Sequence, residues 1–210
     1  MSDWLCTLDG RLLHRFVIRL ICGVILFFTA SFAVTSALHG VRLHYGEQIG
    51  NITIKGSAST DEIEQLQKEI SKVPEWISQR FIDCGGVIYL SERPLSDVFS
   101  DLDPKDGAIG VFSPTNKAIW IYNSETSIED ATIHEYGHFL DSSLDRVSKS
   151  EDFQACYEME KQAFLLIDQN KYHIESAQEY FAETFELFIK SPRKLKRSCP
   201  ATYEFFKSLI

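Results

Sequence analysis

The distribution of hydrophobic and polar residues along this chain predicts strands first and helices afterwards. Short apolar runs at 87–90, 108–112 and 118–122 are separated by glycine, proline, serine and asparagine, and the last two are typical of a hairpin. Apolar residues recur at helical spacing elsewhere, which predicts helices over 60–83 with a restart at Pro74, and over 127–142, 149–168, 176–190 and 200–209. This order favours the α+β class, with a small antiparallel or mixed sheet.

One longer apolar run, at residues 20–38, contains no formally charged residue and follows Arg11, Arg15 and Arg19. Positive charge before an apolar run keeps the N-terminus in the cytoplasm and sends the following residues across the membrane. The run is long enough for a membrane anchor. It also fits a signal peptide, with small residues at 35–37 as a cleavage site, while a buried core helix is a third reading. Both main readings predict a secreted or membrane-anchored domain outside the cytoplasm.

These patterns divide the chain into three parts. Residues 1–38 are the signal peptide or membrane anchor, and 39–59, with several glycines and a short strand near 51–55, are expected to be a spacer. Residues 60–210 form the predicted globular domain, which we expect to be a monomer. The sequence shows no internal repeat.

Composition narrows the partners of this domain. The chain has 210 residues, 44% of them hydrophobic and 24% charged, with a net charge of −9. Nucleic acid is therefore not an expected partner, because phosphate binding needs a basic surface. The five cysteines form no closely spaced pair, which argues against a thiolate zinc site.

The clearest chemical motif lies in the helix predicted over 127–142. His134 and His138 are four residues apart, so their side chains stand on one helix face about 5–6 Å apart and can converge on one zinc ion. Glu135 is rotated about 100° from His134, which places it where a base for the zinc-bound water belongs. A helix with histidines exposed on its surface and no metal site could have the same residues at the same spacing, so the motif needs support from elsewhere in the chain.

A catalytic zinc site needs a third protein ligand and an open position for water. No histidine follows His138 at the spacing of a three-histidine site. The helix at 176–190 instead carries Glu179 and Glu183 on one face, among several aromatic residues. Acids in such surroundings are costly unless they are paired or bound to metal, although exposed acids at an apolar edge are the simpler reading. Glu179 is the candidate third ligand, and Glu183 is a candidate acceptor for a histidine N–H.

The pair of motifs, HEYGH at 134–138 and EYFAETF at 179–185, resembles the metallopeptidase domain of anthrax lethal factor and the related secreted Pro-Pro endopeptidases. The resemblance covers roughly residues 60–210 and implies a zincin fold of the glutamate-ligand type, with an active-site helix and C-terminal helices. It implies that His134, His138 and Glu179 bind Zn²⁺, with Glu135 as general base and Glu183 outside the ligands. Tyr172, seven residues before Glu179, matches a tyrosine close to the zinc in that family.

The expected function is therefore a zinc-dependent endopeptidase that uses a zinc-bound water to cleave an extracytoplasmic or host protein. Tyr172 would donate a hydrogen bond to the oxyanion. Its neighbour His173 is an alternative electrophile or ligand. The strand at 118–122 is a candidate edge for pairing with an extended substrate. The alternative function is a catalytically silent binding module with a zincin fold, tethered to the membrane by the N-terminal helix if that helix is not cleaved.

Overall fold

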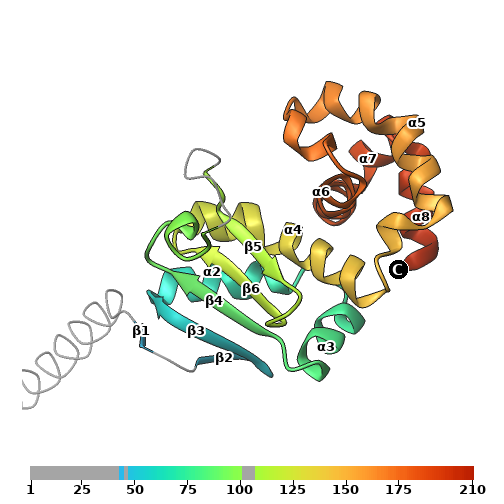
Figure 1. Ribbon diagram of the computed structural model, residues 1–210. Coiled ribbons are helices and arrows are strands. Elements are labelled where there is room, and N and C mark those ends of the chain that lie inside the picture. Colours follow the sequence, from blue (N-terminus) through green and yellow to red (C-terminus); the bar gives the residue numbers. More distant parts are fainter. Residues whose placement is uncertain (1–42, 45–46, 101–106) are drawn as a thin grey trace, which may run out of the picture. The chain divides into compact units, whose positions relative to one another are not determined.

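Strands from three regions of the chain form one mixed sheet in the computed structural model, which describes residues 43–44, 47–100 and 107–210 (Figure 1). The strands are β1 (Leu43–His44), β2 (Glu47–Ile49), β3 (Ile52–Ala58), β4 (Val87–Ser91), β5 (Gly110–Ser113) and β6 (Ala118–Tyr122). The sheet order is β1-β3-β4-β6-β5, and β2 also pairs with β3. The three central strands β3, β4 and β6 run parallel, whereas β5 is antiparallel to β6 and is the outermost strand on its side.

The remaining elements are mostly helical, and they follow the sheet strands or connect them. Two helices, α2 (Thr60–Ile70) and α3 (Glu75–Asp83), link β3 to β4, and the short 3-10 helix η1 (Leu95–Asp97) follows β4. After β6 come α4 (Glu125–Ser143), η2 (Val147–Lys149), α5 (Glu151–Asp168), η3 (Lys171–Ile174), α6 (Ala177–Lys190), α7 (Pro192–Ser198) and α8 (Pro200–Leu209). The predicted α+β class is confirmed, and each helix predicted within residues 60–210 is present.

One face of the sheet forms the core, because the strands alternate buried and less buried side chains. Ile54, Ile88 and Ile119 point into this core, which helices α2, α3 and α4 cover. On the opposite face, the rings of Tyr89 and Trp120 stack with centroids 4.0 Å apart. The sheet therefore fixes one side of α4 by burying it.

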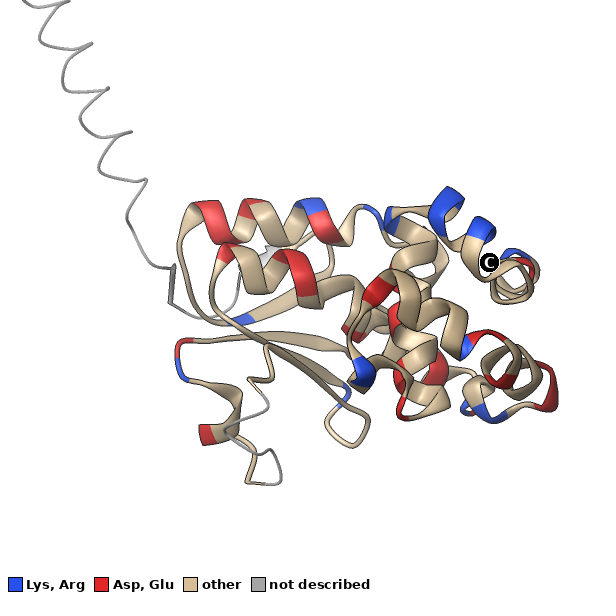
Figure 2. Cartoon of the chain, turned by 90° about the horizontal axis from the view of Figure 1, so that it is seen from above, with Lys and Arg blue, Asp and Glu red and all other residues tan. Residues whose placement is uncertain are grey.

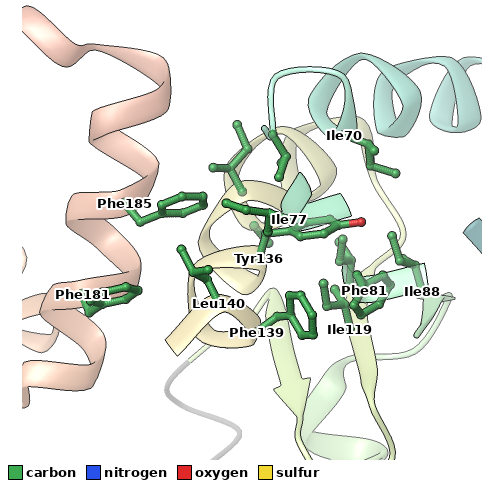
Figure 3. Packing of buried hydrophobic residues seen from close by; sticks show 14 of the residues in the cluster. Ile70, Ile77, Phe81, Ile88, Ile119, Tyr136, Phe139, Leu140, Phe181 and Phe185 are labelled. Carbon is green, nitrogen blue, oxygen red and sulfur yellow. The ribbon is translucent and has the colours of Figure 1, made fainter. Parts of the chain in front are cut away.

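Helix α4 lies between the sheet and the C-terminal helices α5 to α8 (Figure 1). On one side, Tyr136 and Phe139 pack against Phe81 of α3 (Figure 3). On the other side, α4 packs against α6, where Phe181 and Phe185 are fully buried. Because both sides of α4 are covered, the polar residues that it carries are held in a rigid setting.

The C-terminal helices pack around a group of aromatic rings and one buried acid. Phe153 of α5 contacts Phe181 of α6 and Phe206 of α8. Glu160 of α5 is 5% exposed, and its carboxylate accepts hydrogen bonds from the backbone N–H groups of Ala201 and Thr202 at 2.8 and 2.9 Å. A carboxylate at a helix start satisfies amide donors that have no partner within the helix, so Glu160 attaches α8 to α5.

The structure differs from the sequence predictions at the sheet edge, at the start of the sheet and at the start of helix α4. The strand at 118–122 is not an edge, because β6 lies between β4 and β5, and the edge is β5. The segment 39–59 contributes β1, β2 and β3 to the sheet, so the paired part of the chain begins before residue 60. Helix α4 begins at Glu125, after the cap Ser124, rather than at the predicted residue 127. The first two depend on strand pairing between distant segments, which local patterns do not encode.

The predicted signal peptide or membrane anchor at 1–38 lies outside the described residues. Among the residues that are described, no helix has the length and apolar character needed to span a bilayer. Helix α7 carries four basic residues, Arg193, Lys194, Lys196 and Arg197. In Figure 2, Lys and Arg segments lie close to the C-terminus.

Replacing Glu160 with Ala should lower the free energy of unfolding by about 2–3 kcal/mol, because it leaves the start of α8 without its buried acceptor. Urea unfolding followed by circular dichroism measures this loss. Glu158→Ala is the matched control on the same helix, since Glu158 is exposed and pairs with Lys161, and it should change stability by less than about 0.5 kcal/mol. Equal effects of the two substitutions would contradict the attachment of α8 through Glu160.

Candidate metal centre

Helix α4 holds the two histidines of the motif on the side that faces α6. Their rings meet edge to face, with centroids 4.8 Å apart, and both Nε2 atoms point toward one spot, 3.1 Å from each other. The spacing of four residues produces this arrangement, since side chains at i and i+4 lie one above the other on a helix. His134 and His138 are thus brought together as the sequence predicts.

Helix α6 brings the predicted carboxylates to the same place. It begins at Ser176, whose hydroxyl accepts the backbone N–H of Glu179, so Glu179 lies in the first turn of α6. The buried rings of Tyr180, Phe181 and Phe185 hold the apolar side of the helix in the core. This packing turns Glu179 and Glu183, one helical turn apart, toward the histidines of α4.

The backbones of α4 and α6 approach closely, which allows the histidines of one helix to reach the glutamates of the other. A Cβ atom added to Gly137 would lie 2.8 Å from the Cα atom and 3.1 Å from the carbonyl oxygen of Ala182. Only glycine allows this contact, because any side chain would collide with the backbone of α6. Gly137 lies between the two histidines and Ala182 lies between the two glutamates, so the contact sets the distance between the two pairs.

The three candidate ligand atoms form a nearly equilateral triangle. The sides are 3.1 Å between the histidine Nε2 atoms, 3.4 Å from His138 Nε2 to Glu179 Oε2, and 3.6 Å from His134 Nε2 to the same oxygen. Zinc bonds of about 2.0–2.2 Å in a tetrahedral site separate neighbouring ligand atoms by about 3.3–3.6 Å. Two imidazoles and one carboxylate are also a known ligand set for catalytic zinc. The residues therefore fit a zinc ion in both geometry and chemistry.

Glu183 supports His134 from behind this triangle. Its Oε2 lies 3.1 Å from His134 Nδ1, so the ring can donate its second N–H to the carboxylate while Nε2 stays directed at the ligand triangle. Such a partner fixes the tautomer and orientation of a metal-binding histidine. The Nδ1 atom of His138 is buried and has no hydrogen-bond partner among the described residues.

The acids around the histidines perturb their protonation. Burial lowers the pKa of His134, but hydrogen bonds to Glu179 and Glu183 outweigh burial and raise that pKa well above its usual value. Burial favours the neutral form of Glu179, yet hydrogen bonds from His134 and His138 prevail and hold its pKa far below the usual range. The cluster thus favours a positive charge between the histidines and Glu179, which a divalent cation can supply.

Glu135 lies beside the triangle but is directed to the sheet. It is 4% exposed, and burial is the main cause of its raised pKa, while a hydrogen bond from the backbone of Phe112 in β5 opposes the rise. A Cβ atom at Gly110 of β5 would lie 2.5 Å from Glu135 Oε1, so the edge strand approaches this carboxylate closely. The Oε2 atom of Glu135 is buried and has no partner within the described residues. A carboxylate with a raised pKa and one free oxygen suits proton transfer.

Tyr172 and His173 lie on η3, the turn that precedes α6. The side chain of Tyr172 is 54% exposed, and its ring centroid is 6.2 Å from that of His173. His173 of this turn reaches the cluster, because its Nδ1 lies 2.8 Å from Asp168 and 3.5 Å from Glu183. Sequence reasoning named His173 only as an alternative electrophile or ligand. It did not anticipate Asp168, because this residue at the end of α5 meets His173 only through the path of the turn that follows the helix.

Fold and site together define a metallopeptidase of the zincin type. A family model described as anthrax toxin lethal factor, N- and C-terminal domain, matches residues 45–209. The chain therefore belongs to the anthrax toxin lethal factor family and contains a lethal factor-like zinc metallopeptidase domain.

A solved structure shares this fold. The Pro-Pro endopeptidase PPEP-2 from Paenibacillus alvei superposes with a TM-score of 0.61 and 23% sequence identity, covering 78% of this chain and 100% of that chain. No curated protein matches the sequence. Membership of a metallopeptidase family implies a metal ion, typically zinc, and a protein or peptide substrate.

Substituting Gly137 with Ala should weaken zinc binding by about tenfold or more, because the added methyl group forces α6 and its glutamates away from the histidines. The change should also lower stability, although alanine is the better helix former by about 1 kcal/mol. Competition with a chromophoric chelator measures the affinity. Ser142→Ala on the same helix is the control and should bind zinc as the wild type does. Unchanged affinity in Gly137→Ala would show that the close contact does not set the site.

Proposed function

We propose that this protein is a zinc-dependent endopeptidase in which His134, His138 and Glu179 bind the metal and Glu135 is the general base. The observation that carries the proposal is the triangle of ligand atoms with a buried carboxylate of raised pKa beside it. Zinc, when bound, supplies Lewis acidity, which acidifies water and polarises a carbonyl group. The chain's own residues provide the proton transfers and the placement of the substrate.

Glu135 accepts a proton from the attacking water and later delivers it to the leaving amine. Burial raises the pKa of Glu135 above its usual value, which makes the carboxylate a stronger base. The hydrogen bond from Phe112 keeps the carboxylate in place, and its Oε2 makes no hydrogen bond within the described part of the chain. Glu183 maintains the orientation of His134 throughout.

The exposed edge of β5 is the proposed binding site for an extended substrate. It is the last strand on its side of the sheet, so its outer backbone groups can pair with a peptide by strand addition. Gly110 and Phe112 of this strand contact Glu135, so a peptide paired here runs past the general base. We assign the substrate edge to β5 in place of the strand at 118–122.

Tyr172 is proposed to donate its hydroxyl proton in a hydrogen bond to the oxyanion that develops on the cleaved carbonyl. Its position seven residues before Glu179 and its place on the turn next to His173 support this role. More than half of its side chain is exposed, which leaves it accessible to an arriving peptide.

The proposed substrate is an extracytoplasmic or host protein, and the proposed location is secreted or anchored at the membrane with the catalytic domain outside. This rests on the arginines that precede the apolar run at 20–38. A silent binding module is the weaker candidate, because metal binding by itself requires no buried carboxylate beside the ligands.

Exchanging Glu135 for Gln should reduce peptide cleavage by a hundredfold or more, roughly the contribution of a general base, and leave zinc stoichiometry near one per chain. Cleavage of a peptide library followed by mass spectrometry provides the measurement. The library should include Pro-Pro sequences, because the solved relative is a Pro-Pro endopeptidase. Glu125→Gln, at the start of the same helix, is the control and should cleave normally. A fully active Glu135→Gln variant, or a wild type that binds zinc and cleaves nothing, would contradict the proposal.

A further inference from the structure

His173 joins three elements that meet behind the ligand triangle. Its Nδ1 atom lies 2.8 Å from Asp168 Oδ2, at the end of α5, and 3.5 Å from Glu183 Oε2, on α6. The imidazole itself belongs to η3, the turn that carries Tyr172. Glu183 uses the same oxygen to accept from His134. One carboxylate oxygen therefore lies between a candidate metal ligand and the turn of the candidate oxyanion donor.

Hydrogen bonds hold the turn at both ends, and one of them comes from α5. Asn170 caps η3 by accepting the backbone N–H of Tyr172 at 3.1 Å, and the amide nitrogen of Asn170 lies 2.9 Å from His173 Nε2. The hydroxyl of Tyr157 on α5 donates to the carbonyl oxygen of Ile174 at 2.7 Å. With its Nε2 facing the amide donor, His173 carries its proton on Nδ1 and directs it to the carboxylates. The contact with Glu183 then links this turn to α6.

Glu183 has an acidic neighbour, so an imidazole beside it reduces the repulsion between the two carboxylates. Glu186 lies close to Glu183 and His134, and burial followed by the negative charge of Glu183 raises the pKa of Glu186. Lys190 pairs with Glu186 and not with Glu183. His173, whose Nδ1 is hydrogen-bonded to Asp168 and lies 3.5 Å from Glu183 Oε2, therefore places a second imidazole beside Glu183. This imidazole opposes the repulsion from the neighbouring acids and helps to keep Glu183 opposite His134.

We propose that His173 is a positioning residue that ties the turn carrying Tyr172 to the carboxylate that orients His134. The inference rests on the proposed function and extends it, because it couples the metal ligand to the oxyanion donor through one imidazole. Partners of metal-binding histidines typically contribute about 10–100-fold to metal affinity. Loss of His173 should therefore weaken zinc binding and, separately, loosen Tyr172.

The test compares His173→Ala, His173→Asn and Lys171→Ala in the full chain. The amide nitrogen of asparagine can take the place of Nδ1, so His173→Asn should retain most of the contact with Glu183, whereas Lys171 is an exposed residue of the same turn and is the control. Zinc affinity is measured by competition with a chromophoric chelator, and kcat and KM are measured at saturating zinc. His173→Ala should bind zinc about tenfold more weakly and show a reduced kcat with little change in KM. His173→Asn should recover most of both, and Lys171→Ala should match the wild type.

A double variant separates positioning from a general loss of structure. If His173 acts through Glu183, then His173→Ala combined with Glu183→Gln should lose little more zinc affinity than Glu183→Gln does alone. Fully additive losses, or His173→Ala with wild-type affinity and kcat, would overturn the inference and leave the proposed function standing. A wild type that binds no zinc would overturn the proposed function, and this inference with it.

Discussion

The close packing of α4 against α6 is the constraint on which the rest of the site depends. Gly137 allows the backbone of α6 to approach at Ala182, and the residues on either side of these two positions are the histidines and the glutamates. Two local pairs, each four residues apart, become one cluster only at this interhelical distance. Buried phenylalanines, among them Phe181 and Phe185, maintain the contact by giving α6 a single way to pack.

Helix α4 carries polar residues in its middle turns, although both of its sides are buried. Tyr136 and Phe139 bind it to the sheet side and Leu140 contributes to the shared core, as Figure 3 shows. Its polar residues His134 and Glu135 then need partners within the protein. His134 pairs with Glu183 of α6, and Glu135 accepts a hydrogen bond from the backbone of Phe112 in β5. The helix thus connects the ligand cluster to the strand that is the proposed substrate edge. The site is buried enough to shift the pKa values of His134 and Glu135, and it lies next to the edge strand β5.

The sequence was informative where the chemistry follows helical spacing. The i and i+4 spacing predicted both the histidine pair and the glutamate pair, and the aromatic neighbours of Glu179 indicated that its helix packs in the core. The edge of the sheet was misassigned, because the order of β4, β6 and β5 depends on pairing between distant strands. The contacts of His173 were also not predictable, since Asp168 and Glu183 approach it only through the packing of α5 against α6. Tyr172 entered through family resemblance, and its proposed role remains a prediction.

Anomalous diffraction at the zinc edge, from crystals of the zinc-loaded protein, tests the central claim most directly. The account predicts one anomalous peak about 2.0–2.2 Å from the Nε2 atoms of His134 and His138 and from an oxygen of Glu179. A peak held instead by Asp168, His173 and Glu183, or zinc-loaded crystals with no peak at the triangle, would contradict it.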